Sequence, residues 1–147
     1  MIARRALLAT PLAVLARRSH AQPAGHLQQA IADFAQGKPV QRGRVKLDVE
    51  PLVDNGNLVP VGVYVDSPMT AADHVVAIAI FNDKNPQRDV AQFTLGPRAG
   101  KAQVATRMRL ATSQKLAALA RMNDGSVWMD TVDVVVALAA CIEGDVN

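Results

Sequence analysis

The chain has 147 residues, half of them hydrophobic, which suits one domain with a substantial core. Aromatic residues make up only 3%, so a pocket that stacks flat rings is disfavoured. The formal net charge is +3, but residues 1–21 contain four arginines and no acid, and residues 22–147 carry 12 basic and 13 acidic side chains. A nucleic-acid footprint needs clustered Lys and Arg on the folded domain, so nucleic-acid binding is disfavoured.

Residues 1–21 have the pattern of an export signal. Arg4-Arg5 form a basic start, and Ala6 to Ala16 form an apolar stretch too short to span a bilayer. Small residues at the −3 and −1 positions predict cleavage after Ala21, and the paired arginines favour the twin-arginine route. The alternative is a basic amphipathic N-terminal helix. The export pattern predicts a periplasmic protein, and since no other long apolar stretch follows, we expect no membrane attachment.

A short helix is expected next, from His26 to Gln36. Leu27, Ile31 and Phe34 share one face of the helical wheel, and Gly37 is a plausible stop. Residues 22–43 are therefore predicted to form the helix and a connector, residues 44–139 the main domain and residues 140–147 a C-terminal tail.

From residue 44 the hydrophobic period changes from helical to two, which predicts strands. Strand 76–81 is apolar on both faces and should be central. The turn Asn123-Asp124-Gly125 favours a hairpin, and thus strand over helix for the Ala-rich segment before it. We predict an all-β, immunoglobulin-like antiparallel β-sandwich with a short N-terminal helix. The expected strands are 44–50, 59–65, 76–81, 90–95, 104–110, 115–122, 126–129 and 132–139.

Few residues suggest catalysis or metal binding. His26 and His74 lie far apart without a ligand-spaced partner, so we expect no metal site and no cofactor. The carboxylates are scattered through turns and wet faces, where solvated acids are more common than a catalytic pair. A modest basic cluster is either a solvated face or an anion-steering patch. Its members are Arg98, Lys101, Arg107 and Arg109.

Cys141 is the single cysteine of the chain. An exported protein normally uses cysteines in pairs, so a lone one indicates an intermolecular bond or a free thiol. Its place close to the end of the sequence predicts a thiol that can visit other proteins. The alternative is a small buried hydrophobe that finishes a strand. Glu143 and Asp145 are its nearest charged neighbours in the sequence, so we expect a raised thiol pKa and a sluggish nucleophile.

An ordered set of motifs resembles the SoxY family of thiosulfate-oxidation carriers. The likeness covers roughly residues 44 to 144. Its first half consists of Asp54-Asn55-Gly56-Asn57, Val59-Pro60, Val65-Asp66-Ser67-Pro68-Met69-Thr70, Ala72-Asp73-His74-Val75, Ile80-Phe81 and Lys84-Asn85-Pro86. Its second half consists of Thr106-Arg107, Arg109-Leu110-Ala111, Ser113-Gln114-Lys115, Met122, Asp124-Gly125-Ser126, Trp128, Asp133-Val134 and Leu138-Ala139-Ala140-Cys141.

The resemblance implies an immunoglobulin-like sandwich, a periplasmic address and a heterodimer with a second small β-sandwich subunit, SoxZ. It also implies that Cys141 is the covalent attachment site for sulfur intermediates. In the family, that thiol receives thiosulfate by oxidative coupling to a haem enzyme and then presents the adduct to a hydrolase and a sulfane dehydrogenase. The resemblance therefore implies a substrate carrier, not an enzyme.

The tail departs from the family pattern. The typical sequence is Gly-Gly-Cys-Gly-Gly, whereas Cys141 lies between Ala139-Ala140 and Ile142-Glu143. Alanine is slim, but Ile142 is β-branched and Glu143 is charged, which predicts a stiffer tail. Two functions remain open: a covalent sulfur carrier, or a non-catalytic exported β-sandwich interaction module with an incidental cysteine.

Overall fold

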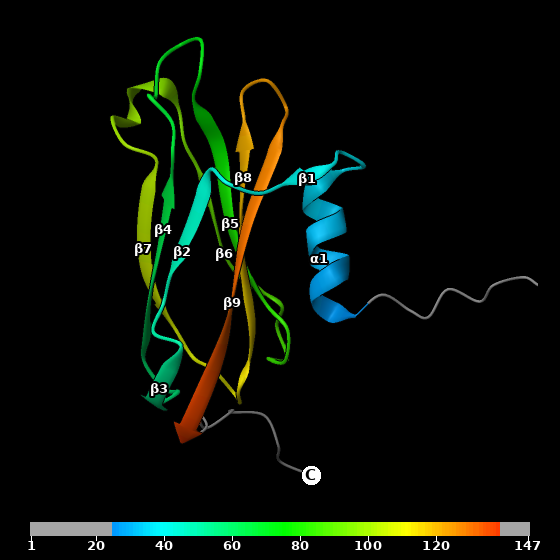
Figure 1. Ribbon diagram of the computed structural model, residues 1–147, viewed down its shortest axis with the longest axis vertical. Helices are drawn as coiled ribbons and strands as arrows, with labels where there is room; N and C mark the ends of the chain where they lie inside the picture. Colours follow the sequence, from blue (N-terminus) through cyan, green and yellow to red (C-terminus); the bar gives the residue numbers. More distant parts are fainter. Residues whose placement is uncertain (1–24, 139–147) are drawn as a thin grey trace, which may run out of the picture.

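The computed structural model describes residues 25–138 as one short helix and two β-sheets packed face to face (Figure 1). The larger sheet has six strands in the order β1-β9-β8-β5-β6, with β3 also paired to β9, and the smaller has the order β2-β4-β7. The predicted all-β sandwich with a short N-terminal helix is confirmed. No helix among these residues is long and apolar enough to cross a membrane. The elements are α1 (His26–Ala35), β1 (Val40–Gln41), β2 (Val45–Asp48), β3 (Leu52–Asn55), β4 (Val59–Val65), β5 (Val75–Asn82), β6 (Asp89–Thr94), η1 (Pro97–Ala99), β7 (Gln103–Met108), β8 (Gln114–Met122) and β9 (Val127–Leu138).

Strand β5 is interior, as its doubly apolar sequence predicts. It lies between β6 and β8 in the larger sheet. Ile78 and Ile80 point into the core between the two sheets, while Ala77, Ala79 and Phe81 pack in a second cluster against α1. Successive side chains of a strand alternate between faces, so one strand serves both layers.

The smaller sheet closes the other side of the main core. Val59, Val61 and Val63 of β4 are almost fully buried, whereas Pro60 and Tyr64 on the opposite face of the strand are exposed. Pro60 pairs only with β7, because β2 pairs with β4 from Gly62 onward. A residue without an amide hydrogen is tolerated at such a strand start.

Helix α1 covers the outer face of the larger sheet (Figure 1). Leu27, Ala30 and Phe34 form its buried face. The Phe34 ring packs edge-on against Phe81 with centroids 6.1 Å apart, and the Arg121 guanidinium lies 4.7 Å from the Phe34 ring centre and donates to the Phe34 carbonyl. Arg88 forms an ion pair with Asp33 at 2.9 Å. The helix is therefore fixed by apolar packing and by two arginines, Arg121 of β8 and Arg88 just before β6.

Two features of strand pairing differ from the sequence prediction. Between the expected strands 44–50 and 59–65 lies an additional strand, β3, which pairs in parallel with β9. The predicted connector also contributes β1, again parallel to β9. Parallel pairs come from distant parts of the chain, and the local sequence of such short strands carries little period-two signal.

The strands predicted at 126–129 and 132–139 are one continuous strand, β9. Asp130 and Thr131 interrupt the apolar pattern, but the side chains of both form hydrogen bonds with neighbouring segments. Asp130 accepts the Leu47 N–H at 2.9 Å and Thr131 accepts a hydrogen bond from Arg42. A polar pair whose hydrogen bonds are met does not end a strand.

Candidate functional site

The predicted attachment residue, Cys141, lies outside the described residues, as do the predicted export signal and the 140–147 tail. The structure describes the chain as far as Leu138, three residues before the cysteine. The geometry of the site is therefore that of the strand from which the tail departs, β9.

The last part of β9 runs past the end of its long neighbour β8. The final β8–β9 pair is Gln114 with Val134. Beyond it, β3 takes over on the other edge, with Leu52 opposite Val135 and Asn55 opposite Leu138. Figure 1 shows β3 beside the end of β9, at the same end of the sandwich. The short strand β3 thus supports the segment that leads to Cys141.

Three further hydrogen bonds hold this segment from both sides. The Val135 N–H donates to the Pro51 carbonyl at 2.8 Å, and the Gly56 N–H donates to the Leu138 carbonyl at 2.8 Å. On the opposite edge, the Val136 N–H donates to Ser113 Oγ at 2.9 Å. The backbone is therefore held by the fold up to Leu138.

This anchoring limits the reach of the thiol. A fully extended chain spans at most about 3.6 Å per residue. Cys141 is three residues beyond Leu138, so its Cα lies within about 11 Å of the Leu138 Cα. Any protein that reacts with Cys141 must approach this end of the sandwich.

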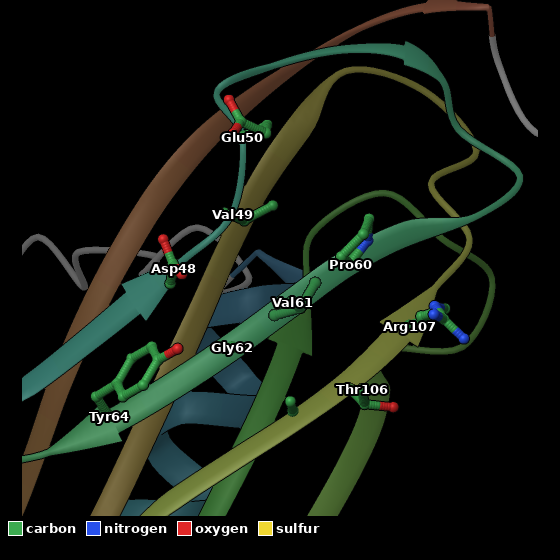
Figure 2. Close-up of a pocket in the computed structure, with 10 residues that line it drawn as sticks. Asp48, Val49, Glu50, Pro60, Val61, Gly62, Tyr64, Thr106 and Arg107 are labelled. Carbon is green, nitrogen blue, oxygen red and sulfur yellow. The ribbon is translucent and has the colours of Figure 1, made fainter.

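A separate open hollow of about 810 Å³ lies on the outer face of the smaller sheet (Figure 2). Gly62 forms part of its floor, and a side chain there would come within 3.3 Å of the Tyr64 ring. Acidic Asp48 and Glu50 lie on one side and Arg107 on the other. The hollow belongs to the β2-β4-β7 sheet, whereas the tail departs from the larger sheet, so we assign the hollow no part in the thiol chemistry.

The predicted basic cluster is divided by β7. Arg98 and Lys101 precede the strand, while Arg107 and Arg109 lie at its far end. Lys101 and Arg107 are six residues apart, which at about 3.3 Å per residue separates the two pairs by roughly 20 Å, so they do not form one patch. His74 precedes β5, and its ring nitrogen Nδ1 lies 2.9 Å from the Thr70 carbonyl, a local hydrogen bond.

Comparison with known proteins decides the family. The family model described as sulfur oxidation protein SoxY matches residues 31–141, well over half of the chain. The chain belongs to the SoxY family. The matched segment ends on Cys141, so the family likeness extends from the described fold to the cysteine itself.

Solved structures agree with this SoxY assignment. The sulfur carrier protein SoxY from Chlorobium limicola f thiosulfatophilum is 29% identical, with a TM-score of 0.63, and the match covers 75% of this chain and 90% of that one. A search of curated proteins found no match.

Superoxide reductases share the fold alone. The enzyme from Ignicoccus hospitalis (neelaredoxin) is 19% identical, with a TM-score of 0.56 and coverage of 64% of this chain and 80% of that one. A putative superoxide reductase from Thermotoga maritima is 22% identical, with a TM-score of 0.54, and the match covers 71% and 90% of the two chains. Within residues 25–138 of this SoxY-family chain, no three His, Cys, Asp or Glu side chains are grouped to hold a metal ion.

The residues that hold the tail's origin were missed at the level of sequence. Ser113 accepts a hydrogen bond from the β9 backbone through its side chain, and Gly56 donates one to β9 through its backbone N–H. No local sequence pattern predicts either contact. The only sequence signal for β3 was the apolar pair Leu52-Val53, which is too short to distinguish a strand from a loop.

Proposed function

We propose that this SoxY-family protein is a periplasmic carrier that binds sulfur intermediates of thiosulfate oxidation covalently on Cys141 and presents them to partner enzymes. The single observation that carries the proposal is the family match that runs through the described sandwich and ends on the only cysteine. The described strand leading to Cys141 is anchored as far as Leu138, three residues before the cysteine, which supports a site at this end of the sandwich.

The loading step is an oxidation. The Cys141 thiol and thiosulfate join through a new S–S bond to give a protein-bound thiosulfonate, with release of one proton and two electrons. The electrons pass to a haem enzyme, the class of partner that the family resemblance implies. A hydrolase then removes the terminal sulfonate as sulfate, and a sulfane dehydrogenase oxidises the sulfur left on the cysteine.

The carrier supplies no catalytic group of its own in this scheme. Activation of the thiol is left to the partner's site, which is consistent with the acidic residues that follow Cys141 in the sequence. A SoxZ-like subunit is the expected stable partner, and the pattern of residues 1–21 supports export to the periplasm.

Intact mass spectrometry of the protein purified from its own periplasm tests the proposal. We expect adducts whose added masses correspond to sulfur and sulfonate groups, which thiol reduction removes. Cys141→Ser should abolish every adduct and leave the circular-dichroism spectrum unchanged. Bare mass alone, from cells that are oxidising thiosulfate, would favour the interaction module with an incidental cysteine.

A further inference from the structure

Exposed large hydrophobic side chains gather where the tail leaves the fold. Of the five found among residues 25–138, four lie at this end, with 54–66% of their surface exposed. We call these four the apolar collar: Leu52, Leu58, Val135 and Leu138. The fifth, Tyr64, lies on the outer face of the smaller sheet.

The pairing of strands brings the collar together. Leu52 and Val135 are register partners on β3 and β9, so their side chains share one face. Leu138 is joined through its carbonyl to Gly56, two residues before Leu58 in the turn to β4. The collar therefore lies at one end of the sandwich, with Leu52 and Val135 on one face of the β3–β9 pair and Leu138 on the other, because positions three apart on a strand point to opposite faces.

Folding does not require these side chains to be apolar. The two buried clusters of the protein are complete without them, since none of the four belongs to either. Single exposed leucines are ordinary, but a concentration of exposed apolar side chains at one end of a small protein marks a contact surface.

The short reach of the thiol identifies what makes that contact. Because the Cys141 Cα stays within about 11 Å of Leu138, an enzyme that encloses the thiol brings the rim of its site against the collar. We propose that the apolar collar is the docking surface for the enzymes that act on Cys141, and that it fits an apolar rim around a narrow thiol-binding recess. This inference rests on the proposed carrier function.

A docking surface of this kind separates recognition from chemistry. A typical interface derives most of its binding energy from a few apolar or aromatic anchors. Substitutions in the collar should therefore lower the affinity of the carrier for the enzyme and leave the intrinsic reactivity of the thiol unchanged.

The test measures enzymatic loading of the full protein, in complex with its second subunit, by the same organism's thiosulfate-coupling haem enzyme. Intact mass follows loading with thiosulfate over time for wild type, for the double variant Leu52→Ser with Leu58→Ser, and for Tyr64→Ser as the matched control. Alkylation of Cys141 by iodoacetamide reports the reactivity of the thiol without any enzyme.

We expect the double variant to lose at least about tenfold in kcat/KM for loading, mainly through KM, with an unchanged alkylation rate and melting temperature. Tyr64→Ser should load like wild type. If the double variant destabilises the fold, the single variants Leu52→Ser and Leu58→Ser replace it, each with a smaller loss.

Four results would overturn the docking proposal. Equal loading of wild type and the double variant would refute it and leave the carrier function standing. A changed alkylation rate would mean that the chain's own tail packs on the collar. Loss of the second subunit, or an altered self-association by gel filtration, would make the collar a stable subunit interface. Failure of wild type to load, together with bare mass in the periplasm, would remove the carrier function and this inference with it.

Discussion

Asp124 fixes the tip of the hairpin between β8 and β9. Its Oδ1 accepts the Ser126 hydroxyl at 2.6 Å and the Ser126 N–H at 2.8 Å, while Trp128 Nε1–H donates to the same hydroxyl at 3.1 Å. These hydrogen bonds to Ser126, from the side chain first and then the backbone, lower the pKa of Asp124 below its ordinary value. Folding therefore stabilises the ionised form of the Asp124 carboxyl relative to its protonated form.

This shift predicts a specific acid dependence of stability. A carboxyl whose folded pKa is lowered contributes stability that is present above its unfolded pKa, near 3.9, and is lost as the pH falls through the folded value. Asp124→Asn should therefore lower the melting temperature at pH 7, and the difference from wild type should shrink toward pH 2. Thermal melts followed by circular dichroism across this range give the comparison. Asp54→Asn, at an exposed position of β3, is the control, and a constant offset of Asp124→Asn at every pH would contradict the assignment.

At the scale of elements, helix α1 forms part of the folded core, because its buried face packs against β5 and β8. Phe34 lies between Phe81 and the Arg121 guanidinium, and only 7% of its surface is exposed. Without this ring, the outer faces of Ala79 and Leu119 would lie beside a cavity. The helix protects the side of β5 that the smaller sheet cannot reach.

Phe34→Ala should accordingly destabilise the protein by about 3 kcal/mol, the usual cost of removing a buried phenylalanine ring. Urea unfolding followed by far-ultraviolet circular dichroism measures the change. Tyr64→Ala removes an aromatic ring that is 40% exposed and should cost no more than about 1 kcal/mol. Similar losses for both variants would show that α1 contributes little to the folded state.

The elements that sequence predicts well are those whose own residues carry the period. The helix at His26 was expected from its helical spacing and the strand Val59–Val65 from its alternation, and Ala-rich β8 was correctly favoured as strand because a hairpin turn follows it. Strands β1 and β3 were missed because they are held by pairing with β9, far away in sequence. The continuity of β9 through Asp130 depends on an acceptor role toward Leu47 that only the packed sheets reveal.

The same division holds for the candidate site. Cys141 could be singled out from sequence because it is the only cysteine and ends a recognisable set of motifs. The collar could not, because exposure of Leu52 and Val135 is a property of where β3 pairs. Chemistry-bearing residues can be recognised by type, whereas a contact surface exists only after the strands are assembled.

At the scale of the whole molecule, both apolar faces of β5 are covered within one chain. A doubly apolar strand in a chain of this size could also have been covered by a partner subunit. Instead, Ile78 and Ile80 are covered by the smaller sheet, and Ala79 and Phe81 lie beneath α1. The expected heterodimer with a SoxZ-like subunit therefore stays a prediction that rests on the family resemblance and not on uncovered core.

This internal closure predicts that the chain folds without its partner. Residues 22–147 expressed alone should give a β-rich circular-dichroism spectrum and one cooperative thermal transition, because each buried cluster is complete within the described residues. Adding the SoxZ-like subunit should raise the melting temperature in a concentration-dependent way, since a partner that binds only the folded state stabilises it by mass action. Gel filtration at matched concentrations shows whether the complex forms. A chain that stays unfolded or aggregates until the second subunit is present would mean that the interface supplies part of the core, and that carrier and partner fold as one unit.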